Sequence, residues 1–97
     1  MSNSYLLTPE ADNDLVSIWL YTFENWGREQ ANTYLRELEK RFLLLAKNPD
    51  SGKPRDNIRS GYFSYHQARH VIFFRVNKGR IEIVRILHDR MDFNRHL

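Results

Sequence analysis

Apolar residues recur in two different rhythms along the chain. Between residues 8 and 47 they recur at every third or fourth position, which predicts two amphipathic helices. Between residues 69 and 88, two runs rich in β-branched and aromatic residues flank Asn77-Lys78-Gly79, the pattern of a β-hairpin. Both faces of this hairpin carry apolar groups, so it is expected at the centre of a sheet with material packed on each side.

The first helix is expected to begin at Thr8-Pro9 and to end at Gly27. Thr8 is a suitable N-cap, and Pro9 fits the first helical position. The second helix runs from about Arg28 to Lys47, so the very short link makes an antiparallel helical hairpin. The predicted buried stripes are Ala11, Leu15, Ile18, Trp19, Thr22 and Trp26 on the first helix, and Ala31, Tyr34, Leu35, Leu38, Phe42 and Leu45 on the second.

The remaining segments complete one small domain, residues 1–97. A short strand is expected at residues 3–7, a polar loop with Ile58 as its anchor at 48–61, a further strand at 62–66, and a short helical turn or arm at 89–97. The predicted order is β-α-α-β-β-β. This is an α+β fold, in which the helical hairpin packs on an antiparallel sheet completed by a C-terminal three-strand meander. The sequence does not indicate which edge the first strand occupies.

Strict alternation assigns the strand residues to two faces. Val71 and Phe73 are expected on the face opposite to Ile72, Phe74 and Val76; on the next strand, Ile81, Ile83 and Leu87 are expected opposite to Val84 and Ile86. Trp19, Leu38 and Phe73 are predicted to be buried between the helical hairpin and the sheet. The tail covers only part of the other face, so an apolar patch rimmed by arginines is expected there, suited to a protein partner.

Charge is distributed unevenly over the two halves of the chain. Residues 1–52 carry five Lys or Arg and eight Asp or Glu, a net charge of −3, whereas residues 53–97 carry ten and four, a net charge of +6. The basic half is expected to face an acidic partner, unless the arginines only solubilise the sheet. The chain has no cysteine and no apolar run of the ~20 residues that span a bilayer, so a cytoplasmic location is expected, away from membranes.

One cluster has residue types suited to catalysis. The arginines of the set Arg69, Arg75, Arg85 and His88 could clamp a phosphate, and His88 could exchange protons during RNA cleavage. The competing interpretation is a set of polar contacts across the strands, such as Glu82 with Arg80, and it is favoured because no second acid–base group is evident. The spacing of the four histidines does not match a metal site, and there is no glycine-rich phosphate loop, so no metal or cofactor is expected.

The ordered set of motifs resembles the RelE/ParE superfamily of toxins from type II toxin–antitoxin modules, and the ParE branch in particular. The matching segments are Leu-Thr-Pro-Glu-Ala-Asp at 7–12, Ile-Trp at 18–19, Trp-Gly at 26–27, Asn-Pro-Asp-Ser-Gly-Lys-Pro at 48–54, Ile-Arg-Ser-Gly-Tyr at 58–62, His-Val-Ile-Phe-Phe-Arg-Val at 70–76 and Ile-Val-Arg-Ile-Leu-His-Asp-Arg-Met-Asp at 83–92. No single motif is decisive, but the order is specific.

The resemblance implies a non-enzymatic toxin that inhibits DNA gyrase and blocks replication, without sequence-specific nucleic-acid binding of its own. It also implies a cognate ParD-like antitoxin, an acidic segment that folds across the toxin. Candidate partner-binding residues are Arg59, Arg75, Arg85, Tyr21 and Phe23. Two alternatives remain open: a RelE-like ribosome-dependent ribonuclease that uses Arg69, Arg85 and His88, and an interaction module without toxicity.

Overall fold

The computed structural model describes residues 4–97, and its elements follow the predicted order. They are β1 (Tyr5–Leu7), α1 (Pro9–Trp26), α2 (Arg28–Lys47), the 3-10 turn η1 (Pro49–Ser51), β2 (Lys53–Pro54), β3 (Phe63–Gln67), β4 (His70–Asn77), β5 (Arg80–His88) and α3 (Phe93–His96). The predicted helices and the three-strand meander are confirmed. Asn3, where the first strand was expected to begin, lies outside the described residues. The loop at 48–61 holds two short elements, η1 and β2, that the sequence did not predict.

The five strands form one mixed sheet in the order β1-β5-β4-β3-β2. The pairs β2–β3, β3–β4 and β4–β5 are antiparallel, as expected. The first strand adds a parallel edge: Tyr5 lies opposite Ile81, and Leu7 opposite Ile83. The α+β class is therefore confirmed, and the sheet is antiparallel except at β1.

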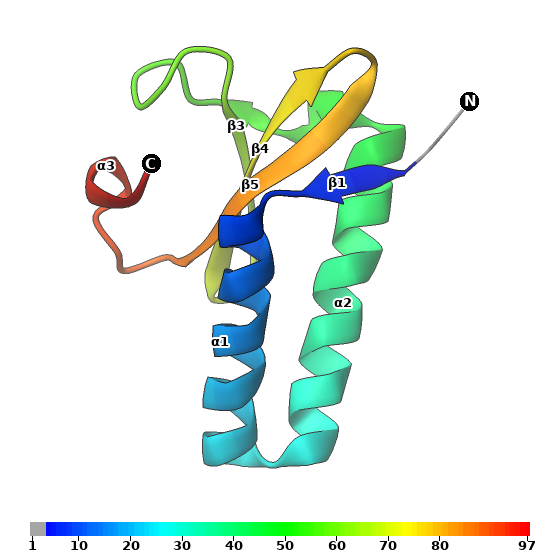
Figure 1. Cartoon of the computed structure of the whole chain (residues 1–97), viewed down its shortest axis with the longest axis vertical. Coiled ribbons are helices and arrows are strands. Elements are labelled where there is room, and N and C mark those ends of the chain that lie inside the picture. The colour runs from blue at the N-terminus through cyan, green and yellow to red at the C-terminus, as the bar shows by residue number, and fades with distance from the viewer. Residues whose placement is uncertain (1–3) are drawn as a thin grey trace.

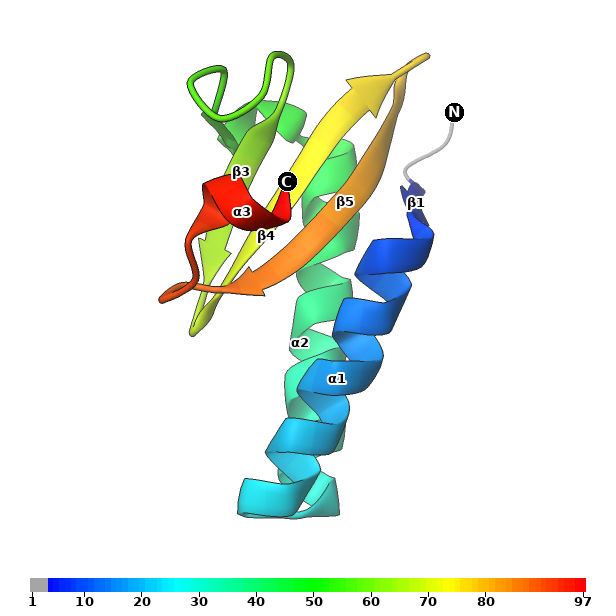
Figure 2. The ribbon, with the colours of Figure 1, turned by 60° about the vertical axis from the view of Figure 1, so that its left-hand side comes forward.

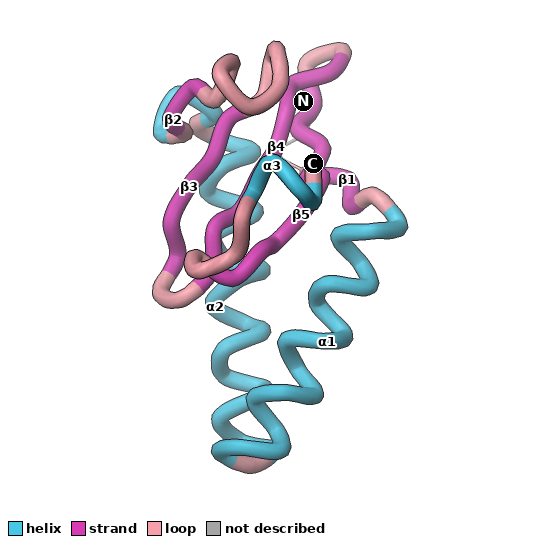
Figure 3. The backbone as a smooth tube through the Cα atoms, turned by 90° about the vertical axis from the view of Figure 1, so that its left-hand side faces the viewer, coloured by secondary structure: helices cyan, strands magenta, loops and turns pink. Residues whose placement is uncertain are grey.

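The helical hairpin covers one face of the sheet, and α3 lies over the other (Figures 1 and 2). Both helices extend well beyond the end of the sheet, so the tip of the hairpin stands clear of it (Figure 1). Seen from the side of α3, β3, β4 and β5 lie in front of α2, and α1 runs to one side of them (Figure 3). No helix within residues 4–97 combines the length and apolar character needed to cross a bilayer.

The larger core lies between the helical hairpin and the sheet. Its fully buried members include Leu38 and Phe42 of α2, which meet Ile72 and Phe74 of β4. Leu38 is therefore buried where the sequence predicted it. Burying these side chains supplies most of the favourable free energy of folding, at about 25 cal/mol for each Å² of apolar surface.

A second core lies on the opposite face, beneath the C-terminal tail. Val71, Phe73, Val84 and Leu87 form it, and Ile58, Tyr62, Phe93 and Leu97 pack over them. The prediction that Phe73 lies under the helices is wrong. Its ring is fully buried in the core on the other face, where its centroid lies 4.9 Å from that of Phe93 in α3. The expected anchor Ile58 belongs to this same core.

A β-bulge moves two residues of β5 from their predicted faces. Phe73 pairs with Arg85 but Phe74 pairs with Ile83, so Val84 is an extra residue in β5. One extra residue inverts the period-two alternation beyond it. Ile86 consequently packs under the helices and Leu87 under the tail, the reverse of the prediction from strict alternation.

Two tryptophans of the predicted helical stripe are not in the core. Trp19 is only partly buried, and its indole Nε1 donates to Asn32 Oδ1 at 2.9 Å. Trp26 is 52% exposed. The prediction of a buried Trp19 and Trp26 is wrong because both helices extend beyond the sheet, which leaves the tip of the hairpin without a covering layer (Figure 1).

Candidate functional site

The predicted site residues divide between two separate pockets. Arg59, Arg75 and Arg85 line one pocket of about 290 Å³, together with Tyr62 and the C-terminal residues His96 and Leu97. Arg69, His88 and Tyr21 line another of about 330 Å³. The two pockets share no lining residue. The sequence predicted Arg69, Arg75, Arg85 and His88 as one cluster on the sheet, whereas the fold divides them between the two pockets.

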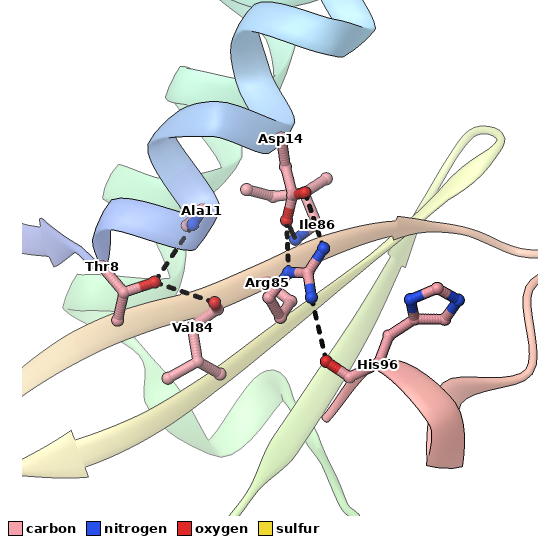
Figure 4. A network of polar contacts seen from close by, with 7 residues as sticks. All are labelled: Thr8, Ala11, Asp14, Val84, Arg85, Ile86 and His96. Atoms are coloured by element: carbon pink, nitrogen blue, oxygen red, sulfur yellow. Dashed lines mark hydrogen bonds and ion pairs between the residues drawn. The ribbon is translucent and has the colours of Figure 1, made fainter.

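Arg85 is held in place by α1. Its Nε and Nη2 atoms donate to the two carboxylate oxygens of Asp14 at 2.8 and 2.9 Å, and the backbone N–H of Ile86 donates to the same carboxylate (Figure 4). The hydrogen bond with Asp14 raises the pKa of Arg85. Its Nη1 reaches the carbonyl oxygen of His96 at 2.9 Å. This arginine therefore ties α1, β5 and the C-terminal tail together.

The N-cap of α1 stands beside this network. Thr8 Oγ1 accepts the backbone N–H of Ala11 at 3.1 Å and donates to the carbonyl oxygen of Val84 at 2.9 Å (Figure 4). The predicted cap is thus confirmed, and it also joins the start of α1 to the bulge of β5.

The other two arginines of the first pocket differ in their partners: Arg75 forms an ion pair, whereas Arg59 contacts an aromatic ring. Arg75 Nε donates to Glu82 Oε1 at 2.6 Å, which lowers the pKa of Glu82 and raises that of Arg75. Glu82 therefore pairs across the hairpin with Arg75; the predicted pairing with Arg80 is wrong, because Arg80 lies two positions away on the same strand and Arg75 lies directly opposite. Arg59 is exposed and stacks on the Tyr62 ring, with 5.9 Å from its Cζ to the centroid.

The apolar patch expected on this side of the sheet is covered. Phe93 and Leu97 of the tail, with Ile58 and Tyr62 of the loop, close over the second core. Exposed apolar side chains gather on α1 instead, where Val16 is 56% and Leu20 is 48% exposed. A groove of about 470 Å³ lies there, lined by Leu7, Asp12, Leu15, Val16, Trp19, Leu20, Leu35 and Glu39.

The second pocket opens between the tip of the hairpin and the β3–β4 turn. Tyr21 and Trp26 of α1 supply exposed aromatic rings whose centroids are 6.1 Å apart. The guanidinium Cζ of Arg69 lies 5.0 Å from the Trp26 centroid, within cation–π range. Phe23, the other predicted aromatic contact, points elsewhere and stacks on Trp19 at 5.2 Å.

The floor of the second pocket contains a partly buried polar pair. Tyr34 Oη lies 2.7 Å from His70 Nδ1, and the His70 ring meets that of His88 at a centroid distance of 5.4 Å. Burial, and next the neighbouring His88, lowers the pKa of His70 to about 4. Burial likewise raises the pKa of Tyr34. Both groups are therefore neutral at pH 7, so the floor carries no charge of its own.

The neutral state of His70 predicts a pH dependence of stability. The folded chain takes up the His70 proton only near pH 4, whereas the unfolded chain takes it up near pH 6.5. Between these values the unfolded state binds more protons, so the contribution of His70 is complete above pH 6.5 and is lost as the pH falls toward 4. Thermal melts from pH 4 to 8 measure this, and His70→Asn is expected to flatten the curve over that window. An imidazole NMR titration of His70 with its midpoint near 6.5 would contradict the prediction.

The ribonuclease set is not assembled in this fold. Arg69 and His88 share the second pocket, but Arg85 lines the first and is bound to Asp14. His88 Nδ1 lies 3.3 Å from Asp89 Oδ1. Within residues 4–97 there is no group of three or more His, Asp or Glu side chains placed to hold a metal ion.

Three residues of the second pocket were not predicted from the sequence. Trp26 and Tyr34 follow the helical rhythm and were assigned to the core, and His70 was considered only as a metal ligand. One signal was present in the sequence: Trp26 immediately precedes Gly27 at the end of the helix, where a side chain has few neighbours.

Comparisons with known proteins agree with this fold. A family model described as the ParE toxin of the type II toxin–antitoxin system parDE matches residues 5–93. Toxin ParE1 of Mycobacterium tuberculosis (strain CDC 1551 / Oshkosh) is 45% identical, with full coverage of both chains. Toxin ParE1 of Caulobacter vibrioides is 42% identical and covers 96% of each chain.

A solved structure supports the same architecture. It is described as a chromosomal ParDE TA system from P. aeruginosa, and it superposes with a TM-score of 0.77 over 90% of this chain and 98% of its own. Because its sequence is only 23% identical to this chain, the superposition supports the fold and nothing more. The family model and the relatives above carry the assignment, and the predicted ParE branch is confirmed: the chain belongs to the ParE toxin family of type II toxin–antitoxin systems.

Proposed function

We propose that this chain is a toxin that inhibits DNA gyrase, blocks replication and is neutralised by a cognate ParD-like antitoxin. Membership of the ParE family over residues 5–93 is the observation that carries the proposal. The separation of Arg85 from Arg69 and His88 supports a non-enzymatic mode of action, because the candidate ribonuclease groups do not converge on one reacting phosphate.

A supercoiling assay with purified bacterial gyrase tests the target. The toxin at micromolar concentration is expected to inhibit supercoiling of relaxed plasmid or to stabilise a cleaved complex. An absence of both effects, with growth arrest after induction in cells, removes gyrase as the target. An absence of growth arrest as well favours the non-toxic interaction module.

One observation keeps the ribonuclease as the second candidate. Arg69, His88 and Tyr34 do line one pocket, so a cation and two proton-exchanging groups lie close together. Primer-extension mapping of messenger RNA after induction separates the candidates. Cleavage within codons that disappears in His88→Ala would replace gyrase inhibition by ribonuclease activity.

For the antitoxin, the structure changes where the contacts are expected. An amphipathic segment that wraps the helical hairpin would bury Val16 and Leu20 in the α1 groove, since the sheet face is already covered by the tail. A second part of the segment would place carboxylates against Arg59 and Arg75. Because apolar burial dominates such an interface, its affinity is expected to fall only moderately with salt.

Calorimetry of the antitoxin peptide at low and high salt measures these terms. Leu20→Asp and Arg59→Glu are expected to weaken binding, whereas Lys78→Glu, in the exposed β4–β5 turn, serves as a matched charge control. Arg85→Glu is unsuitable, because that arginine holds the fold through Asp14. Equal affinity in Arg59→Glu and wild type would remove the arginine pocket from the interface.

A further inference from the structure

The pocket at the tip of the hairpin has the composition of a protein-binding hot spot. Two aromatic side chains that line it are more than half exposed near the end of α1, Tyr21 at 57% and Trp26 at 52%. Trp, Tyr and Arg are the residues most enriched among those that dominate binding energy. Here Arg69 lies over the Trp26 ring and lines the same pocket as Tyr21. Exposed aromatic rings that bind nothing are a cost in solubility, so their clustering in a concave site points to a partner.

The guanidinium of Arg69 is the charged group of this pocket that could form an ion pair with the partner. Among the described residues no carboxylate forms an ion pair with its guanidinium, in contrast to Arg75 and Arg85, which are both paired. Its position in the two-residue turn between β3 and β4 and its stacking on Trp26 restrict its conformations before any partner arrives. Such preorganisation lowers the entropy cost of binding. A carboxylate is the complementary group, because guanidinium binds it through two parallel hydrogen bonds.

The rest of the pocket favours a protein segment over nucleic acid. Arg69 is the sole Lys or Arg among its lining residues, and Glu37 is also one of them. A polyanion requires several cations along its backbone, and the neutral His70 adds none at pH 7. The pocket therefore fits a single acidic side chain flanked by apolar groups that pack on Tyr21 and Trp26.

We infer that the Tyr21–Trp26–Arg69 pocket is the surface by which this toxin engages its target protein, through a target segment that presents a carboxylate beside an apolar side chain. The inference rests on the proposed function in taking the target to be gyrase. The pocket shares no lining residue with either the arginine pocket or the α1 groove assigned to the antitoxin. Antitoxin binding and target binding are therefore separable by mutation.

Variants of Arg69 and Trp26 test the inference. Arg69→Glu and Trp26→Ala are expected to raise the toxin concentration needed for half-inhibition of gyrase by about tenfold or more, as for a hot-spot residue. Their affinity for the co-purified antitoxin is expected to stay within about twofold of wild type. Arg80→Glu, an exposed arginine outside all three pockets, is the matched control and is expected to inhibit like wild type. Circular-dichroism melts confirm that each variant is folded.

Each outcome decides the inference. Inhibition by both variants at wild-type concentrations overturns it, and so does an equal loss of gyrase inhibition and antitoxin affinity, which would assign the pocket to the antitoxin. A third outcome is that the toxin binds plasmid DNA in the absence of gyrase, in a salt-sensitive way, and that both variants abolish this binding. That result would assign the pocket to nucleic acid and would also overturn the inference. If wild-type toxin leaves gyrase unaffected, the proposed target is wrong, and growth arrest becomes the readout. If both variants then fail to arrest growth, the pocket binds a target other than gyrase. If both variants still arrest growth, the inference is overturned.

Discussion

Replacing Phe73 with alanine is expected to lower the free energy of unfolding by about 3–5 kcal/mol, the usual cost of deleting a fully buried aromatic ring. Phe73 has no exposed surface, and its ring meets Phe93 of the tail edge to face at 4.9 Å. The cavity would open under α3 and not under the helical hairpin. Because small domains are stable by only about 5–15 kcal/mol, the loss is a large part of the total.

The face on which Phe73 lies makes the prediction specific. Urea unfolding measures the loss of stability, and limited carboxypeptidase digestion measures the attachment of the tail. Phe73→Ala is expected to release the tail to digestion at urea concentrations where the helices are still folded. Phe74→Ala, the adjacent and equally buried ring on the helix side, is the matched control: it should be as destabilising but leave the tail protected in the folded protein. Equal protection of the tail in both variants would contradict the assignment of Phe73 to the tail-side core.

Removing the Asp14 carboxylate is the second large effect. Asp14→Ala would leave Arg85 without its partner in a site where only 23% of that side chain is exposed, and would free the Ile86 N–H as well. Breaking one side of a buried ion pair costs about 3–5 kcal/mol, and partial access of water places this pair at the lower end, about 3 kcal/mol. The lost contacts join β5 to α1, so the whole domain is expected to unfold earlier.

The Arg75–Glu82 pair provides the matched control. It also joins a guanidinium to a carboxylate, at 2.6 Å, but the Arg75 side chain is 44% exposed. Because solvent reaches the Arg75 guanidinium, this pair is expected to contribute at most about 1 kcal/mol, so Glu82→Ala is expected to shift the urea midpoint less than Asp14→Ala does. Equal shifts for Asp14→Ala and Glu82→Ala would show that the Asp14–Arg85 pair has no special role.

Much of the fold could be predicted from local pattern. The helices begin and end at predicted residues because capping chemistry acts between neighbours: Thr8 binds the N–H of Ala11, and Gly27 takes a φ of 93° that suits glycine at the junction. The β4–β5 turn is likewise local, with positive φ at Lys78 and Gly79. The helical periodicity also identified Leu38, Phe42 and Ile18 as core residues correctly.

The candidate site was only partly predictable. The sequence identified Arg59, Arg75 and Arg85 as a group, and they do share a pocket. It also grouped Arg69 and His88 with Arg85, which the fold separates. The difference arises because a residue's place along a strand does not indicate which remote side chain will bind it. Asp14 and Arg85 lie 71 positions apart, and no local pattern joins them.

The sequence by itself therefore determined the elements, their order, the hairpin turns and membership of the ParE family, since each depends on neighbouring residues or on ordered motifs. Only the tertiary structure decided the parallel place of β1 beside β5, the bulge at Val84 that exchanges the faces of Ile86 and Leu87, and the exposure of Trp26 at the hairpin tip. These features depend on contacts between segments far apart in the chain, and on how far each helix extends beyond the sheet. Both are properties of packing in space, which the order of apolar and polar residues does not contain.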